Sequence, residues 1–503
     1  MSTVTVEDRR RAGQARSRWR LAPAHAALIA VAALYGVAVV LRTSQTTMLD
    51  WDEIVYASQA ARDVPPVPLS APRARGMPWL LAPVTSVTTS IPALRVYLTV
   101  LSAIMMYVAF RPWLSVFRDR EGWQPYVPAA AAGLFATLWI TLLHGTLAYP
   151  NLWVAFTVIA GVGLYCLAMA GHHRKGLVAG IFVAFTAASL FRPVDAAAAA
   201  LPLLVVPLVV RSWRRAAPVG AVGAVAAGLA VGWGEWLYEA VERYGGPLQR
   251  LRDAAELNAG GLTWSLSKHL DALSGPHLLC RPPEVCADTP LWSILWVLAL
   301  PVLVAVGLLA ARGSGSFRVE MLATACALSF AAPYLLLFGY AAPRFLLTAY
   351  GLLAVPVAHG LVRVLRQRTP GARLVATYAV LFLVAAHVLV QQTLLERVND
   401  HLAAITTELT AQAETLRETD RVHPPCLVAG RGALQHGYLL GCRVVAYAGG
   451  PSPVVEERIT QALADGHDVA VVLRSDDAIL PVMAGWERLP LAGPGRYVAY
   501  LSP

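Results

Sequence analysis

The feature that most constrains this chain is a series of apolar runs, each about as long as a bilayer is thick. A membrane-spanning helix needs about 20 consecutive, mainly apolar residues. The sequence therefore predicts an all-α polytopic membrane protein with about 11 transmembrane helices. The runs lie at 24–42, 91–110, 127–147, 151–170, 176–191, 195–210, 217–237, 291–311, 319–338, 343–362 and 374–394.

Composition agrees with a membrane protein and excludes an ordinary soluble domain. Of the 503 residues, 57% are hydrophobic and only 14% are charged, whereas soluble domains carry about 25% charged residues. The formal net charge of +10 would favour nucleic-acid binding in a soluble protein, but the basic residues gather between apolar runs. This arrangement is typical of cytoplasmic loops beside anionic headgroups. We therefore expect the lipid bilayer, and no nucleic acid, as a partner.

The distribution of basic residues predicts the orientation in the membrane. Residues 1–23 form a basic N-terminus, and the apolar run that follows is too long for the core of a signal peptide. With this N-terminus in the cytoplasm, every short inside loop is basic, as the positive-inside rule requires. We expect a multi-pass protein of the plasma (inner) membrane. The inside loops are 111–126, 171–175, 211–216, 312–318 and 363–373.

The remaining segments divide the chain into parts. Residues 24–395 form a transmembrane domain, in which the extracytoplasmic loops 43–90 and 238–290 are the largest. Residues 396–503 follow as a helical stem and a small extracytoplasmic α/β domain, because short apolar runs alternate there with a helical stretch. Polar-apolar stretches too short to span the bilayer predict interfacial helices at 52–63, 73–88 and 247–258.

Two pairs of cysteines fall in segments assigned to the outside. Cys280 and Cys286 share one loop, and Cys426 and Cys442 share the C-terminal domain. Because the extracytoplasmic compartment is oxidising, we expect the disulfides Cys280–Cys286 and Cys426–Cys442. Two pairs of free thiols are the alternative. No Cys or His spacing in the chain indicates a zinc site.

Three carboxylates lie within four residues just after the first apolar run: Asp50, Asp52 and Glu53. A single Asp at this place would serve as the N-cap of a short helix. Three carboxylates beside Trp51 exceed the needs of a cap, and mutually repelling carboxylates are tolerated where a cation, a proton or a substrate is shared. We therefore interpret the segment as a functional site, with helix capping as the alternative.

The segment Asp52-Glu53-x-x-Tyr56 resembles the Asp-Glu-x-x-Tyr start of the first outside loop in aminoarabinose transferases and protein O-mannosyltransferases. These belong to the GT-C superfamily of polyprenyl-phosphate-dependent glycosyltransferases, and the resemblance covers roughly 20–395. It implies that Asp52 is the catalytic base, which takes a proton from the acceptor hydroxyl in an inverting transfer. It implies further that Glu53 positions the acceptor or Asp52, and that Asp50 and Tyr56 bind substrate.

Two arginines at the outer ends of spans are candidate ligands of the donor phosphate. Arg344 opens the tenth run in a segment similar to the Arg-Tyr/Phe-Leu-Leu-Pro-Ala-Tyr segment of that superfamily, with Thr348 where Pro is common. With helix N–H groups it makes an anion site, whereas snorkelling toward headgroups is the alternative. Arg192 would bind phosphate or sugar, with Asp195 as a substrate contact, whereas a local Arg192–Asp195 pair is the alternative.

Weaker candidates lie between the third and fourth runs. His144 and Tyr149 would contact substrate there, but His144 fits equally well as a helix-end histidine bonded to a carbonyl. Relatives often carry an acidic residue near this turn, where this chain has Asn151. The resemblance leaves the cofactor open: some members use a divalent metal, so Asp50 is a candidate ligand for Mg, Mn or Ca, and others use none.

Together these features predict a glycosyltransferase that moves a monosaccharide from a polyprenyl-phosphate donor to a cell-envelope glycan, glycolipid or protein. The usage of Ala, Val, Leu, Arg and Gly is typical of high-GC bacteria, so we expect an actinobacterial arabinosyltransferase or mannosyltransferase in cell-wall biogenesis. A transporter or lipid flippase is one alternative, but it would place ionisable residues in mid-span. A non-catalytic polysaccharide-assembly subunit is the other, and it leaves the carboxylates unexplained.

Overall fold

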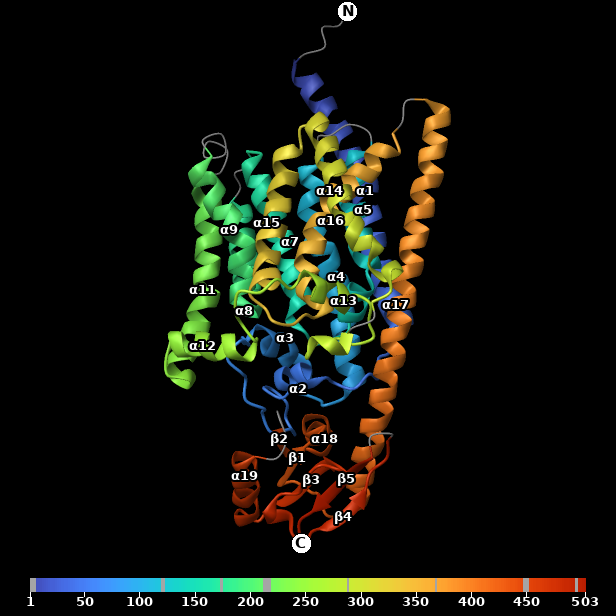
Figure 1. Ribbon diagram of the computed structural model, residues 1–503. Helices are drawn as coiled ribbons and strands as arrows, with labels where there is room; N and C mark the ends of the chain where they lie inside the picture. The colour runs from blue at the N-terminus through green and yellow to red at the C-terminus, as the bar shows by residue number, and fades with distance from the viewer. Residues whose placement is uncertain are drawn as a thin grey trace, which may run out of the picture.

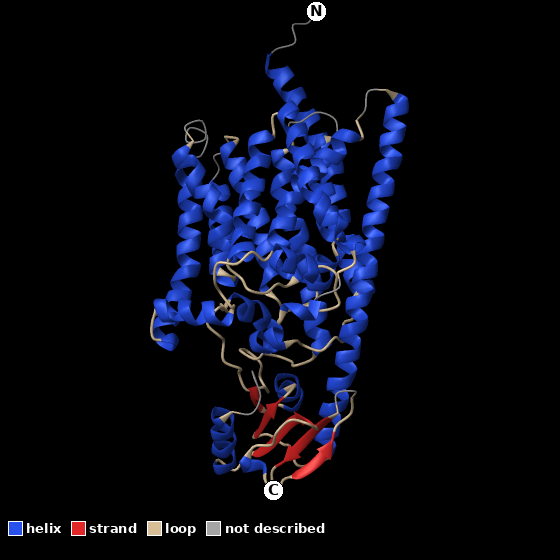
Figure 2. Ribbon diagram, in the orientation of Figure 1, coloured by secondary structure: helices blue, strands red, loops and turns tan. Residues whose placement is uncertain are grey.

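The computed structural model forms a helical bundle that carries a small sheet domain at one end. The N-terminus lies at the opposite end of the bundle (Figure 1), and Figure 2 shows that the strands are confined to the C-terminal domain. Among the described residues, eight helices are long and apolar enough to cross a membrane. The described residues are 6–118, 123–171, 175–210, 219–286, 289–366, 369–446, 452–493 and 496–503.

The predicted apolar runs all fall on helices, which confirms the all-α membrane class. The helices α7 and α16 form the centre of the bundle, since 89% of the apolar window of each is buried. The count of eleven spans stays a prediction, because three runs fall on shorter helices. The long helices are α1 (Val6–Arg42), α4 (Ile91–Val116), α7 (Pro150–Met169), α11 (Val219–Tyr244), α14 (Leu291–Ser314), α15 (Phe317–Leu336), α16 (Leu347–Val364, after the turn η3, Pro343–Leu346) and α17 (Pro370–Glu418).

Several helices are shorter than the sequence predicts, because an extended residue or a proline-rich stretch interrupts them. The run 127–147 is split into two helices because Leu138 has an extended backbone conformation. The interfacial segments predicted at 52–63 and 73–88 form helices shorter than expected, since a proline-rich stretch separates them and proline ends helices. These elements are η1 (Gln124–Tyr126), α5 (Val127–Thr137), α6 (Trp139–His144), α8 (Lys175–Phe191), α9 (Pro193–Val209), α2 (Trp51–Ala57), α3 (Gly76–Thr85), α12 (Pro247–Leu257), α13 (Leu266–Ala272) and η2 (Pro283–Cys286).

The C-terminal domain holds a five-stranded sheet with strand order β2-β1-β3-β5-β4. The first three strands are parallel and the last two pair antiparallel. Successive residues of a strand face opposite sides of the sheet, and Leu427 and Val428 accordingly belong to two separate buried clusters. The elements are β1 (Cys426–Gly430), α18 (Ala433–Leu440), β2 (Arg443–Ala446), α19 (Pro453–Ala464), β3 (Asp468–Arg474), η4 (Pro481–Met483), β4 (Glu487–Pro490) and β5 (Tyr497–Leu501).

The C-terminal domain is attached to the bundle in two ways. The last span and the predicted stem are one continuous helix, α17, which runs from the bundle into the sheet domain (Figure 1). In addition α18 packs against α2, and its Leu434 and Tyr438 belong to the buried cluster of the membrane domain. The structure contains disulfides between Cys280 and Cys286 and between Cys426 and Cys442, the second of which closes the segment around α18.

Candidate functional site

The short helix α2 and its N-cap carry the three carboxylates that follow the first span. Asp50 is its N-cap, and its side chain accepts a hydrogen bond from the N–H of Trp51 at 2.7 Å. Glu53 completes a capping box, because its carboxylate accepts from the N–H of Asp50 at 3.0 Å. Helix capping, the alternative interpretation of the segment, is therefore part of the role of Asp50 and Glu53. A seven-residue helix is too short to be stable by itself, so tertiary contacts must fix α2.

The main contact is a buried ion pair between Glu53 and Arg95 of α4. Both side chains are at most 1% exposed. Arg95 also donates to the carbonyl oxygens of Thr47 and Thr146, each at 3.0 Å, and the N–H of Ala148 donates to Glu53 at 2.6 Å. Glu53 is thus enclosed by hydrogen-bond donors. These contacts hold α2, the helix that carries Asp52, against the bundle.

Asp52 points the other way, into a partly open site between two arginines. Arg73, from the loop before α3, donates to one carboxylate oxygen, and Arg344 of η3 donates to the other at 3.1 Å. The side chain of Asp52 is 27% exposed, against 7% for Arg344. Asp52 is therefore held in place by two cations while one side of it stays accessible.

The two cations decide the protonation state of Asp52. Burial alone would raise its pKa, but the guanidiniums of Arg73 and Arg344 outweigh burial and hold the pKa below its ordinary value. The charge of Arg192 acts in the same direction. Asp52 is therefore ionised at neutral pH, in the state that accepts a proton.

Asp50 belongs to the same hydrogen-bonded network, through Tyr149. The hydroxyl of Tyr149 donates to Asp50, and the guanidinium of Arg344 lies over the Tyr149 ring at 4.3 Å from its centre. Loss of solvent around the carboxylate, together with the charge of Asp52, raises the pKa of Asp50 against the effect of the Tyr149 hydrogen bond. Neighbouring carboxylates with pKa values shifted in opposite directions are typical of acid–base sites.

Arg192 and Asp195 form the local pair that was one of the two alternatives. The Arg192 Nε donates to Asp195 at 2.7 Å, and the hydroxyl of Tyr334 donates to the same carboxylate oxygen at 2.7 Å. Arg192 nevertheless remains close enough to influence Asp52 and Tyr56. The pair therefore holds Arg192 at the edge of the site without removing its charge from it.

Two predicted substrate contacts lie deeper than the open part of the site. The Nδ1 of His144 donates to the carbonyl of Ile140 at 2.8 Å, as expected of a helix-end histidine. Its ring packs beside that of Tyr149, with centres 5.5 Å apart. Tyr56 lies one helical turn after Asp52 and is buried. His144 and Tyr56 are thus both buried, at 1% and 4% exposure.

Two arginines of the site were missed by the sequence analysis. Arg95 lies in the second turn of α4, and an ionisable residue inside an apolar run is itself a signal of a functional or paired group. Arg73 gives no such signal, because Arg75 stands two residues later in an equally polar loop. Only the fold shows which of these two arginines faces Asp52.

The residues around Asp50 do not form a set of metal ligands. Within the part of the chain that the structure describes, no three His, Cys, Asp or Glu side chains gather closely enough to hold an ion. The neighbours of Asp50 and Asp52 are a tyrosine hydroxyl that donates and guanidiniums, which have no lone pair for a cation. The neighbours of Asp50 and Asp52 therefore do not fit a divalent metal ion.

Comparison with known proteins identifies the fold. No family model and no curated protein matches the sequence. The structure is similar to that of ArnT from Cupriavidus metallidurans bound to undecaprenyl phosphate, with a TM-score of 0.60 and 13% identity over 94% of this chain and 97% of that chain. The chain has the GT-C fold. This confirms the resemblance in fold that the Asp52 segment indicated.

A second GT-C structure supports the same assignment. The oligosaccharyltransferase of Archaeoglobus fulgidus, tethered to an acceptor peptide, has a TM-score of 0.52 and 13% identity, over 90% of this chain and 69% of that chain. At this identity the likeness shows the GT-C fold and leaves the reaction of this chain to be argued from its own residues.

Proposed function

We propose that this GT-C protein is a glycosyltransferase that moves one sugar from a polyprenyl-phosphate donor to an acceptor hydroxyl. The observation that carries the proposal is Asp52, a partly open carboxylate between the guanidiniums of Arg73 and Arg344. The structure of ArnT, similar in fold, was obtained with undecaprenyl phosphate. We assign the reaction to the extracytoplasmic side, where the positive-inside rule puts the loop 43–90 and the C-terminal domain.

The donor phosphate would bind the arginines around Asp52. Planar guanidiniums bind phosphate oxygens through paired hydrogen bonds. Arg73, Arg192 and Arg344 are all close enough for their charges to lower the pKa of Asp52. The same cations would stabilise the negative charge that the phosphate gains as it leaves. We therefore assign phosphate binding to Arg344 and Arg192, as the sequence predicted, and add Arg73.

An apolar groove would hold the polyprenyl chain. Its volume is about 550 Å³, and its walls come from α5, α14, α16 and α17. The wall is made largely of apolar side chains, including Leu300, Tyr350 and Val357. Arg344 lies six residues before Tyr350, so η3 and α16 together connect the phosphate site with the groove. An isoprenoid chain there would bury apolar surface while its phosphate stays at the arginines.

Asp52 is the group that we propose as the base. A sugar hydroxyl is a poor nucleophile, and a carboxylate within hydrogen-bond reach takes its proton while the new bond to the anomeric carbon forms. The bond from the anomeric carbon to the phosphate oxygen breaks on the opposite face, so the anomeric centre is inverted. Once phosphate shares the charges of Arg73 and Arg344, Asp52 becomes a stronger base than in the free protein.

The sugar and the acceptor are the finer parts of the proposal. We propose arabinose or mannose on a polyprenyl phosphate as the donors to test first. The acceptor would be a cell-envelope glycan, glycolipid or protein, which are the hydroxyl-bearing molecules on the extracytoplasmic side that we assign to the reaction.

A transporter is the second candidate, because the bundle contains a buried ionisable pair. Glu320 of α15 and His359 of α16 form a pair at 2.6 Å inside the bundle, where both side chains are at most 2% exposed. Buried ionisable pairs between spans are typical of proton-coupled transport. Their enclosure, with Ser316 as a further partner of Glu320, favours a structural role instead.

The deciding experiment measures sugar transfer by the purified full-length protein from a panel of polyprenyl-phosphate sugars. The wild type should transfer at least one sugar, and Asp52→Asn should reduce the rate about 10²- to 10⁴-fold, the usual contribution of a general base. Asp63→Asn, an exposed carboxylate of the same loop, is the matched control. Equal rates for wild type and Asp52→Asn would rule out Asp52 as the base, and translocation without transfer would favour the transporter.

A further inference from the structure

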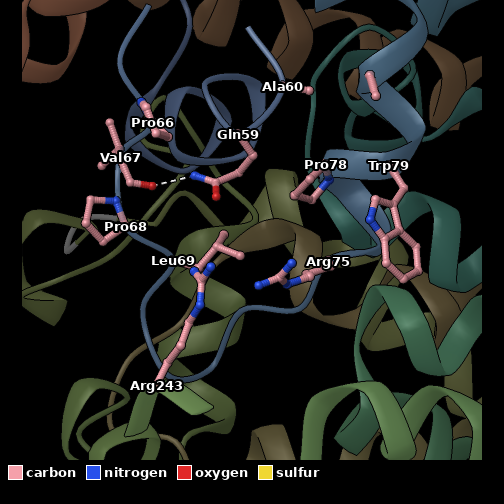
Figure 3. A pocket seen from close by; sticks show the side chains of 11 residues that line it. Gln59, Ala60, Pro66, Val67, Pro68, Leu69, Arg75, Pro78, Trp79 and Arg243 are labelled. Atoms are coloured by element: carbon pink, nitrogen blue, oxygen red, sulfur yellow. Dashed lines mark hydrogen bonds between the residues drawn. The ribbon is translucent and has the colours of Figure 1, made fainter. Parts of the chain in front are cut away.

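A second hollow lies beside the carboxylate site, on the outer side of the bundle. It has a volume of about 410 Å³ and opens between the loop after α2, the helix α3 and the end of α11. Figure 3 shows Trp79 and Pro68 on opposite sides of it, with Arg75 and Arg243 entering from different elements. None of these residues belongs to the arginine cluster that surrounds Asp52.

The chain connects the hollow directly with Asp52. Gln59 follows the end of α2, seven residues after Asp52, and its side-chain amide donates to the carbonyl of Val55 at 3.0 Å. At a rise of 1.5 Å per residue, seven residues extend about 10 Å. Arg75 stands two residues after Arg73, which binds Asp52. These two short links keep the hollow close to Asp52 along the chain.

The side chains of the hollow suit a sugar ring. The indole of Trp79 is 52% exposed, and prolines and apolar side chains form much of the remaining wall. A flat aromatic surface packs against the apolar face of a sugar, while a few fixed polar groups bind its hydroxyls. Those polar groups are Gln59, Arg75 and Arg243.

The two arginines of the hollow are held by carboxylates. Arg75 is paired with Glu239 at 3.0 Å and with Glu235 at 3.3 Å, and Arg250 shares Glu239 at 2.9 Å. Arg243 lies 3.8 Å from the same Glu239. Paired guanidiniums are still hydrogen-bond donors, so they can bind the hydroxyls of a neutral sugar. The hollow differs from the proposed donor site in its exposed tryptophan and its apolar wall.

We infer that this hollow is an acceptor subsite, which holds the sugar residue next to the one whose hydroxyl is glycosylated. The inference rests on the proposed function and makes it more specific, since it requires an acceptor of at least two sugar residues. The acceptor ring stacks on Trp79, and its hydroxyls accept hydrogen bonds from Arg75 and Arg243.

The test compares acceptors of different length. The donor is the polyprenyl-phosphate sugar that the transfer experiment identifies, at a saturating concentration. The probes are methyl glycosides of mannose and arabinose, each as a mono-, di- and trisaccharide. Trp79→Ala should raise KM for the di- and trisaccharide about tenfold, should leave kcat unchanged, and should not affect the monosaccharide. Trp79→Phe keeps an aromatic face and should retain most of the affinity. Trp264→Ala, an exposed tryptophan of the other outer loop, is the control.

Each outcome has a separate meaning. If Trp79→Ala raises KM equally for all three acceptor lengths, or for none, the subsite is wrong while the proposed transfer stands. If wild type transfers nothing, the proposed function fails and the subsite with it. Arg243→Gln changes a half-exposed side chain and should raise the same two KM values, which keeps the test valid if Trp79→Ala unfolds the protein.

Discussion

Asp52 and Glu53 are neighbours in the sequence, yet they belong to two different arginine–carboxylate clusters. In the closed cluster, Glu53 and Arg95 are buried and surrounded by backbone donors and acceptors. In the open cluster, Asp52 binds Arg73 and Arg344 but keeps one side accessible. A carboxylate that is enclosed by partners therefore stabilises the structure, whereas a carboxylate that is held on one side only can contact a substrate.

The largest effect is expected on stability, when a substitution removes the ion pair of the closed cluster. Arg95→Met would leave Glu53 as a buried charge without its partner, so we expect the free energy of unfolding to fall by about 3–5 kcal/mol. Thermal unfolding in detergent measures this loss. The matched change in the open cluster, Arg73→Met, should alter stability by about 1 kcal/mol or less, because water reaches Asp52. Equal losses in both variants would contradict the distinction between the clusters.

The next prediction tests whether Arg344 of the open cluster binds the donor phosphate. Arg344→Lys keeps the positive charge but loses the planar fork and the contact with the Tyr149 ring. We expect KM for the polyprenyl-phosphate donor to rise about 10- to 100-fold, which corresponds to about 1.4–2.7 kcal/mol. Thermal stability should stay unchanged. Arg62→Lys, an exposed arginine of the same loop, is the control, and an unchanged donor KM would show that Arg344 does not bind phosphate.

A smaller effect concerns pH. The pKa of Asp52 is lowered, so its ionised form persists at neutral pH and activity should fall only when the pH drops below the usual carboxyl range. Arg73→Gln removes one of the cations that favour the anion, so the pKa of Asp52 should rise. We expect the acidic limb of the kcat/KM profile, which reports the free protein, to move upward by about one pH unit. A limb that does not move would mean that another group is the base.

The smallest effect tests the contact between the C-terminal domain and α2. Tyr438 of α18 packs into the cluster that supports α2, and burial raises its pKa to about 12. Tyr438→Ala should loosen α2 and lower kcat about three- to fivefold, an effect of less than 1.4 kcal/mol, with donor KM unchanged. Tyr438→Phe should restore kcat. A change in donor KM alone would place the role of Tyr438 in binding.

Much of the fold could be predicted from the sequence because apolar length is a local property. Each span of the bundle follows from its own run of residues, and the helix at 247–258 follows from its own periodicity. The helix α18 and the strand β4 were not predicted. Three of the four residues of β4 are exposed and only two are polar, so the strand lacks the alternation that marks a half-buried strand. The helix α18 is only eight residues long and is stabilised by packing against α2.

The candidate site, too, could be predicted only in part from the sequence. The sequence alone predicts that carboxylates follow the first span and that Arg344 stands at the start of the tenth run, because both are statements about neighbours in the chain. Only the tertiary structure decided that Asp52 meets Arg73 and Arg344 while Glu53 meets Arg95. Consecutive residues of a helix point in different directions, and the partners that meet them come from segments far away in the sequence. Burial and charge pairing depend on those partners, and so does the chemistry of each carboxylate.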